Sequence, residues 1–282
     1  MKHRVAAVQM VSSGNIDHNL TAAAGLIRAA VEQGAELVLL PENFAVLDGG
    51  PLRQFAEREG AADTLLQGFL AGQARSHGIT LIGGTIPLLS RPPASDGSQR
   101  PDLDDGRVRP ASLVYDPEGR LIARYDKLHL FDVKVADRQA EYLESRSFEA
   151  GDDPVIATTP LGRVGLTICY DLRFPELYRK LLEAGAEILT VPSAFTRTTG
   201  EAHWEVLLRA RAIENQCFVL AANQGGVHNE SRETYGHTMI VDPWGKVLAR
   251  VERGEGLAVA DLDLQQLVRI RQDMPIVNHR RL

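Results

Sequence analysis

The sequence predicts an α/β fold, a four-layer α-β-β-α sandwich of two similar halves. Strand-like apolar runs alternate with helical patterns along the chain, as in sheets covered by helices. Residues 34–41 (GAELVLLP) resemble residues 185–192 (GAEILTVP), and residues 116–124 (DPEGRLIAR) resemble residues 242–250 (DPWGKVLAR). Both echoes occur in the same order. Each half therefore reads as a helix–strand unit followed by a hairpin, with Asp-Pro-x-Gly setting each turn.

The expected elements follow from periodicity and from turn residues. Strands are predicted at 4–10, 37–40, 79–84 and 187–191, and strands dominate from 217 to 262. Helices are predicted from 17 to about 33, at 51–59, 63–77, 175–184 and 201–215, and from 264 to the residue before Pro275. Residues 90–110, rich in Pro, Asp, Gly, Ser and Arg, are expected to form a surface loop.

Three of these helices have a predicted face. Asp17 is expected to cap the first helix, which Gly34 ends. The apolar residues predicted to line the helix faces are Leu20, Ala24, Ile27 and Val31 in the first, Val206, Ala210 and Ile213 in the helix at 201–215, and Leu264, Leu267 and Ile270 in the last.

Length and composition favour one domain over residues 1–282 with an ample core, 44% of the residues being hydrophobic. The formal charge is −6, and no basic stripe or zinc-finger spacing indicates nucleic acid. No signal peptide is recognisable, and no segment approaches the ~20 apolar residues of a membrane span. Two cysteines make no disulfide framework. We therefore expect a soluble, cytoplasmic protein.

Cys169 carries the strongest functional signal. In residues 165–176 (GLTICYDLRFPE) an apolar strand runs into the cysteine, a polar turn follows, and Pro175 and Glu176 open a helix. The thiol is thus expected at a sharp strand-to-helix turn near a positive helix N-terminus, as the serine of a nucleophile elbow is. A buried, inert thiol is the alternative that the residue alone favours. Cys217, in an apolar strand, is expected to be core.

Glu42 and Lys127 follow other predicted strands. Glu42 comes after the strand at 37–40, and Lys127 stands in YDKLHLF (residues 125–131). Carboxylate, ammonium and thiol suit each other chemically, since the carboxylate can take the thiol proton while the ammonium favours a thiolate or an oxyanion. Taken singly, Glu42 could cap a turn and Lys127 could be solvated.

These segments resemble the motifs of the nitrilase superfamily of carbon–nitrogen hydrolases. The resemblance covers nearly the whole chain and includes LPEN at 40–43, KLHLFD at 127–132, AHWEVLLRARAIENQ at 202–216 and GHTMIVDPWG at 236–245. The sequence CYDLRFPE around the cysteine is similar to that of the Nit branch of amidases, and the CWE motif of true nitrilases is absent. The family fold is the α-β-β-α sandwich.

The resemblance implies a role for each residue. It makes Glu42 the general base, Lys127 the thiolate and oxyanion partner, and Cys169 the nucleophile. The backbone N–H of Tyr170 becomes the second oxyanion donor. A second glutamate assists in the family; Glu144, in LES at 143–145, fits that place best, with Glu141 as the rival.

Further residues are pocket candidates. Arg173 could clamp a substrate carboxylate, or could pair with Glu176 or Asp171. Phe195, Thr196 and Thr199 follow the echo strand at the same sheet edge, unless they form an ordinary loop and helix cap.

We expect no cofactor and no metal, because the histidines show no metal-ligand spacing. His203 and His237 are expected to be structural hydrogen-bonders.

The expected function is cofactor-free amide hydrolysis through a thioester. The resemblance suggests deaminated glutathione as substrate, or α-ketoglutaramate or a related short carboxylate-bearing amide. A positive pocket made by the helix N-terminus, Lys127 and Arg173 would favour such acids. A non-catalytic ligand-binding or scaffolding module is a second class, and a Cys–His peptidase or redox thiol protein a third.

A homodimer or larger assembly is also expected. The helix after Pro175 carries an apolar stripe, and family members associate through helices in this region and through the tail at 274–282. The alternative is that the stripe packs only on its own sheet. The residues of this stripe are Leu177, Tyr178, Leu181 and Leu182.

Overall fold

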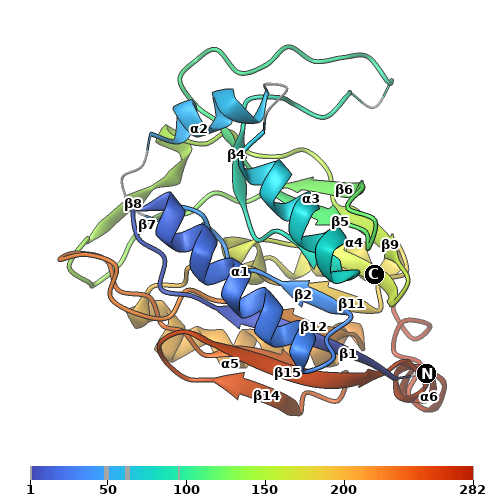
Figure 1. Ribbon diagram of the computed structural model, residues 1–282. Coiled ribbons are helices and arrows are strands. Elements are labelled where there is room, and N and C mark those ends of the chain that lie inside the picture. The colour runs from blue at the N-terminus through green and yellow to red at the C-terminus, as the bar shows by residue number, and fades with distance from the viewer. Residues whose placement is uncertain (1, 48–50, 61–63, 95, 282) are drawn as a thin grey trace.

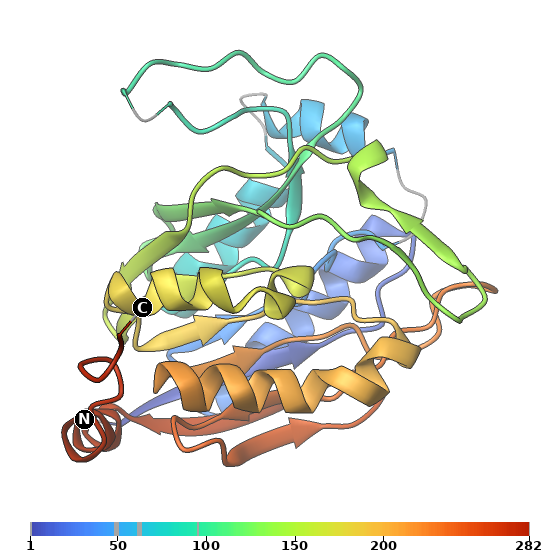
Figure 2. The same cartoon turned by 180° about the vertical axis from the view of Figure 1, so that it is seen from behind.

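Two β-sheets lie face to face, with helices on the outer face of each (Figure 1, Figure 2). The computed structural model describes residues 2–47, 51–60, 64–94 and 96–281. The predicted α-β-β-α sandwich is confirmed. Residue 63 of an expected helix, residue 95 of the expected surface loop and Leu282 of the tail lie outside the described residues.

The strands form two large sheets and a small hairpin. The first sheet has the spatial order β15 (Gly256–Asp263), β1 (Lys2–Gln9), β2 (Leu37–Leu39), β3 (Thr80–Ile82), β5 (Arg109–Tyr115), β4 (Ile86–Leu88), with β6 (Leu121–Asp126) also paired to β5. The second has the order β14 (Val247–Val251), β13 (Thr238–Val241), β12 (Phe218–Ala221), β11 (Ile188–Thr190), β10 (Gly162–Leu166), β9 (Val155–Thr159). The hairpin pairs β7 (Asp132–Lys134) with β8 (Glu141–Leu143).

Helices α1 (Ile16–Glu32) and α3 (Leu66–His77) cover the first sheet, and α4 (Pro175–Glu183) and α5 (Arg197–Asn215) cover the second (Figure 1, Figure 2). The other helical elements are α2 (Leu52–Glu59), α6 (Leu264–Asp273) and two 3₁₀ turns, η1 (Glu144–Arg146) and η2 (Cys169–Arg173).

Alternating burial in β1 shows how the layers are joined. Val5 and Ala7 belong to the hydrophobic cluster between the two sheets, whereas Ala6 and Val8 belong to the cluster under α1 and α3. All four side chains are fully buried. A strand covered on both faces reads as a continuous apolar run, which is why its sequence does not alternate.

The two echoes form equivalent structures. Gly34 and Gly185 follow α1 and α4 with φ of +85° and +86°, a backbone conformation that favours glycine. Asp116 and Asp242 set the turns of the β5–β6 and β13–β14 hairpins, and each carboxylate accepts backbone N–H bonds two and four residues later. Two similar halves are therefore confirmed.

Helix α1 differs from the expectation in its cap and its face. Asn15 is the N-cap, because its side chain accepts a hydrogen bond from the His18 N–H (3.0 Å), so the assignment of the cap to Asp17 is wrong. The buried residues are Asn19, Ala23, Ile27 and Ala30, so the buried face is centred about one residue earlier than predicted. The polar Asn19 can occupy the buried face because its amide donates to the backbone carbonyls of Ser13 and Ala45. An apolar pattern does not reveal such a residue.

Helix α4 does not offer the expected assembly surface. Its four apolar residues, Leu177, Tyr178, Leu181 and Leu182, are all buried within the chain itself. The stripe packs on its own sheet, so using it as an intermolecular surface was wrong. The face of α5 predicted from its apolar residues is not the buried one. Val206 is 69% and Ile213 is 44% exposed, whereas Trp204, Leu208 and Ala212 are buried.

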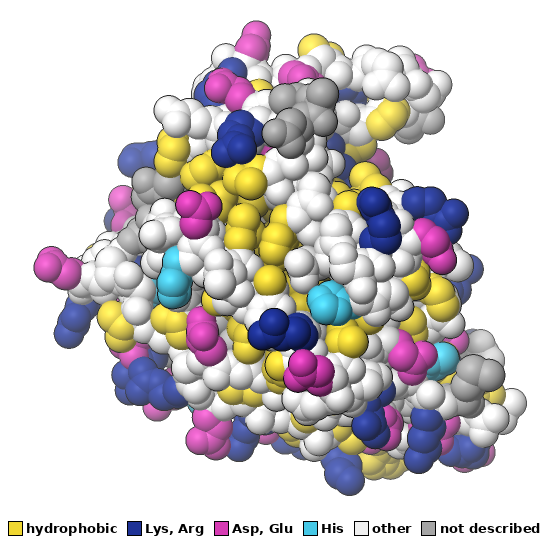
Figure 3. All heavy atoms as spheres, viewed as in Figure 1, with side chains coloured by type: hydrophobic (Ala, Val, Ile, Leu, Met, Phe, Trp, Pro, Cys, Tyr) yellow, Lys and Arg dark blue, Asp and Glu magenta, His cyan; other side chains and the backbone are white. Residues whose placement is uncertain are grey.

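On the face that carries α1 and α3, the described acidic and basic side chains are interspersed and form no continuous patch of one charge (Figure 3). Of the helices in the described ranges, none combines the length and apolar character required to cross a bilayer.

A network of charges ties the long loop before β5 to the first sheet. Glu149 accepts a two-point contact from Arg91, with both distances 2.7 Å, and also bonds to the buried Arg109. Mainly through the hydrogen bonds from Arg91, and with help from Arg109 against the effect of burial, the pKa of Glu149 falls from 4.5 to about 2.

We predict that this network makes stability depend on pH. A carboxyl whose pKa is depressed on folding contributes stability that is full above about pH 4.5 and is lost as the pH falls towards 2, on the order of 2–3 kcal/mol. Glu149→Gln should therefore lower the free energy of unfolding at pH 6. The difference in this free energy between variant and wild type should become smaller by pH 2–3, as measured in urea titrations with a single transition. The exposed Glu118→Gln is the control. Parallel pH curves for wild type and Glu149→Gln would contradict this account.

Candidate active site

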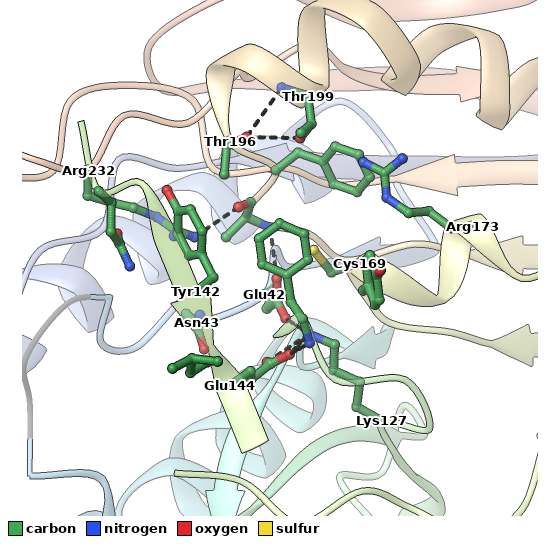
Figure 4. A pocket seen from close by; sticks show the side chains of 16 residues that line it. Glu42, Asn43, Lys127, Tyr142, Glu144, Cys169, Arg173, Thr196, Thr199 and Arg232 are labelled. Atoms are coloured by element: carbon green, nitrogen blue, oxygen red, sulfur yellow. Dashed lines mark hydrogen bonds and ion pairs between the residues drawn. The ribbon is translucent and has the colours of Figure 1, made fainter. Parts of the chain in front are cut away.

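Glu42, Lys127 and Cys169 meet in one pocket although 85 and 42 residues separate them along the chain (Figure 4). Glu42 follows β2, Lys127 follows β6, and Cys169 opens η2 after β10. The Lys127 Nζ lies 2.8 Å from Glu42 Oε1. All three side chains are buried, so the interpretations of Lys127 as a solvated residue and of Glu42 as a simple turn cap are wrong.

Cys169 stands at a strained turn. Its φ of +48° is uncommon for a residue with a side chain and resembles the geometry of a nucleophile elbow. The backbone holds the turn from both sides: the Cys169 N–H donates to Pro192 O (2.9 Å), and the Ile168 N–H donates to a carboxylate oxygen of Asp171 (2.8 Å). The strain is therefore supported by fixed hydrogen bonds.

Glu144 completes a buried cluster of charges. The Lys127 Nζ lies 2.8 and 2.9 Å from its two carboxylate oxygens, and the Phe131 N–H donates to Glu144 Oε2 (2.6 Å). Glu141, the rival in the sequence, lies exposed in β8. The geometry thus brings Glu144, rather than Glu141, to Lys127.

The charges in this cluster govern its protonation. Burial alone would lower the pKa of Lys127, but Glu144 and Glu42 outweigh it and hold that pKa well above its usual value. Burial raises the pKa of Glu144, and the ammonium opposes it. One cation between two carboxylates is the arrangement that a buried lysine requires to remain charged.

The surroundings of Cys169 disfavour the thiolate. Burial raises its pKa, and the neighbouring Glu42 carboxylate raises it further, while Lys127 and the backbone N–H of Ala194 act in the opposite direction. Glu42 is itself fixed by the Ala194 N–H, which donates to Oε2 (2.9 Å). For a thiol in such surroundings to act as a nucleophile, an adjacent base has to remove its proton.

Tyr170 lies one residue after the thiol, in the first turn of η2. The first hydrogen bond of this turn is donated by Asp171 N–H to Ile168 O (3.0 Å), so the Tyr170 N–H precedes it and is one of the donors that a helix start leaves over. A donor there can face an oxyanion that forms beside the sulfur.

A cavity of about 220 Å³ opens beside Cys169. The predicted residues Tyr170, Arg173, Phe195, Thr196 and Thr199 all line it. Thr196 also caps α5, since its side chain accepts from the Thr199 N–H, so the loop-and-cap interpretation and the pocket interpretation both hold.

Arg173 does not pair with Asp171, which turns into the interior to bind Tyr125, His129 and Ile168 N–H. Instead, the Arg173 guanidinium lies 5.3 Å from the Phe195 ring centroid, and its Nη1 is 3.2 Å from His203 Nδ1. His203 is thus a hydrogen-bonding partner, as expected. At His237 it is the backbone carbonyl that accepts, from Trp204 Nε1 (2.7 Å).

Sequence reasoning missed Arg232 and Tyr142, which also line the cavity. The Arg232 guanidinium lies 4.9 Å from the Tyr142 ring centroid, and its Nη2 donates to Ala194 O (3.1 Å). For Arg232 the available signal was the polar stretch that follows β12. The neighbouring strand β11 leads into Phe195, so both segments leave the same sheet. Cys217 is fully buried core, as predicted.

Comparison with known proteins identifies the family. The model of the carbon–nitrogen hydrolase family matches residues 4–272. The deaminated glutathione amidase of Synechocystis sp. is 45% identical over 277 residues, covering 98% of this chain and 97% of the relative. The Homo sapiens protein of the same name is 42% identical over 280 residues, covering 98% and 82%.

Solved structures agree. The C. elegans NitFhit protein superposes with a TM-score of 0.84 at 38% identity, covering 99% of this chain, which spans 65% of the worm protein. Saccharomyces cerevisiae Nit3, a member of branch 10 of the nitrilase superfamily, gives 0.83 at 33% identity, covering 100% and 97%.

The chain belongs to the carbon–nitrogen hydrolase family, within the nitrilase superfamily. It is an amide hydrolase.

We predict that the two neighbouring glutamates differ in importance. Glu144→Gln leaves Lys127 with one carboxylate and should lower kcat for amide hydrolysis about 100-fold or more, the scale of a lost electrostatic contribution to catalysis. Glu141→Gln, its matched control in exposed β8, should change kcat less than about twofold. Steady-state kinetics of the two purified variants make the comparison. A near-normal kcat in Glu144→Gln would show that catalysis does not depend on this carboxylate.

Proposed function

We propose that Cys169 is the nucleophile and Glu42 the general base of this amide hydrolase. Glu42 takes the thiol proton while the sulfur attacks the amide carbonyl carbon and the C–O π pair moves to oxygen. The observation that carries this assignment is the buried cluster of Glu42, Lys127 and Glu144 beside a thiol at a strained turn. Lys127 and the Tyr170 N–H would stabilise the oxyanion.

The remaining steps reuse the same groups. Collapse of the tetrahedral intermediate breaks the C–N bond, and the proton held by Glu42 goes to the departing nitrogen. Water then attacks the thioester, with Glu42 accepting its proton, and the C–S bond breaks to release the acid and restore the thiol. Glu144 would act as a positioning residue that keeps Lys127 charged and in place.

The substrate is proposed to be deaminated glutathione, the compound named for the relatives from Synechocystis and Homo sapiens. Its α-ketoglutaryl group carries a carboxylate that the planar fork of Arg173 can bind at a fixed distance from the γ-amide. The positive charge of the pocket supports an acidic substrate, but it comes from other residues than expected. Lys127 is neutralised by two carboxylates, so the positive charge comes from arginines.

An ω-amidase acting on α-ketoglutaramate is the alternative, since that substrate has the same acyl group and differs only in releasing ammonia. Arg173 and the thiol turn would serve both substrates equally. The choice between them depends on what the leaving-group side of the pocket can bind.

We predict a thioester on Cys169 during turnover. Incubation with deaminated glutathione, acid quench and intact-mass analysis should show one α-ketoglutaryl adduct on wild type, with release of cysteinylglycine. Cys169→Ala should show neither adduct nor turnover, whereas Cys217→Ala should keep both, with at most a modest packing cost. Hydrolysis by Cys169→Ala would contradict covalent catalysis. Preference for α-ketoglutaramate in kcat/KM would make the enzyme an ω-amidase.

We further propose that the enzyme is a homodimer or larger homo-oligomer in the cytoplasm, where a reducing environment keeps Cys169 and Cys217 as thiols, the state they have in the structure. The outward face of α5 supports the assembly. Val206 lies on it, and Trp244, 63% exposed, is beside it because Arg209 donates to Gly245 O (2.8 Å).

We predict that light scattering of the wild type at micromolar concentration gives at least twice the 30.9 kDa chain mass. Val206→Glu places a charge on the proposed contact and should shift the mass towards monomer. Leu121→Glu, 48% exposed at the start of β6, is the control and should not. A monomeric wild type would reject the assembly.

A further inference from the structure

Arg232 is a cation of the pocket that the proposed mechanism does not use. It lines the same cavity as Cys169, half-buried, with its guanidinium against Tyr142 and Ala194. Its buried Nε has no hydrogen-bond partner in the described part of the chain. A guanidinium with an unused buried donor beside a cavity is suited to binding an anion.

Arg232 and Arg173 differ from Lys127 in their ionic partners. Within the described ranges, neither Arg232 nor Arg173 has a carboxylate at ion-pair distance, whereas Lys127 has two. Figure 4 shows the two arginines on opposite sides of the pocket, with the Cys169 sulfur between them. The pocket thus presents two separate sites for negative charge.

Arg232 is linked through one residue, Ala194, to the proposed general base Glu42. Its Nη2 donates to Ala194 O, and the N–H of the same residue donates to Glu42 Oε2. Glu42 must deliver its proton to the departing nitrogen. Ala194 thus connects the guanidinium to the group that protonates the leaving amine in the proposed mechanism, whereas Arg173 lies against the rings of Tyr170 and Phe195.

Arg232 also lines a second cavity. This cavity has a volume of about 220 Å³ and shares Arg232 with the first. Its lining carries charges of both signs: the carboxylates of Asp137, Glu230 and Glu233 lie with the guanidinium groups of Arg138 and Arg197, and Arg197 pairs with Glu233 (2.8 Å). Ammonia would need no such space, whereas a peptide-like amine is long enough to reach beyond Arg232.

We propose that Arg232 binds a carboxylate carried by the leaving amine. The substrate class is then amides with an anionic group at each end, and the product amine is peptide-like. This inference rests on the proposed function. The cysteinylglycine part of deaminated glutathione ends in a carboxylate that Arg232 could bind, whereas α-ketoglutaramate has no such group on its leaving side.

Three substrates with one acyl group test it: deaminated glutathione, its C-terminal carboxamide and α-ketoglutaramate. Arg232→Met should raise KM for deaminated glutathione about 10- to 100-fold, the range for losing a hydrogen bond between charged groups. The carboxamide and α-ketoglutaramate should change much less. Arg173→Met should weaken all three alike, because all share the acyl carboxylate. Arg28→Met, which removes only an exposed partner of Glu32 on α1, is the surface control.

The outcomes distinguish the role inferred for Arg232 from the proposed function on which it rests. Equal losses on all three substrates in Arg232→Met would make Arg232 a structural support of Ala194 and overturn the inference. A wild type that does not distinguish deaminated glutathione from its carboxamide would overturn it as well, while leaving the thioester mechanism in place. A wild type that hydrolyses none of the three would overturn the proposed function, and this inference with it.

Discussion

The buried Lys127 ammonium is the interaction on which the site depends. A charge without contact with water is costly, by several kcal/mol, unless it is paired and hydrogen-bonded. Its two partners come from different places in the fold, Glu42 from the end of β2 and Glu144 from η1 after the small hairpin. The hairpin is therefore anchored over the pocket by the same contact that maintains the lysine charge. Burial, with a smaller contribution from the Glu42 carboxylate, raises the pKa of the thiol beside this cluster, and the Lys127 ammonium opposes that rise.

Asp171 provides the second constraint, because it joins the thiol turn to the strand that carries Lys127. Its fully buried carboxylate accepts from Ile168 N–H, Tyr125 Oη and the His129 N–H and is 2.7 Å from His129 Nδ1. Tyr125 and His129 lie two residues before and two residues after Lys127. One carboxylate thus fixes the strained Cys169 backbone and the lysine with respect to each other. The polar residues of the thiol turn are accordingly part of the support for the chemistry and not a solvated loop.

The sequence could predict the elements that depend on local pattern. The echoes predicted two halves because each contains a turn with its own residue requirements, and the three central residues could be found because each follows an apolar strand. Other features depend on the packing of distant segments. The stripe of α4 has the same pattern whether it meets its own sheet or another chain. The sequence favoured Glu144 but left Glu141 as a rival, and it is the course of the hairpin that brings Glu144 to Lys127. Arg232 stands in a polar stretch after a strand, but that pattern does not single it out, because its position depends on the Ala194 carbonyl, 38 residues earlier.

The repeated architecture explains why the site lies where it does and why it is asymmetric. The strand ends at Pro41 and Pro192 are equivalent in the two halves, and both lead into the pocket. After Pro41 comes the carboxylate of Glu42; after Pro192 come Ser193 and Ala194, whose contribution is a backbone N–H on that carboxylate. Gln224, after β12, donates to the Glu42 carbonyl (3.0 Å), which adds a second support from the other half. One half therefore supplies the base and the other holds it in place, so neither half alone contains a complete site.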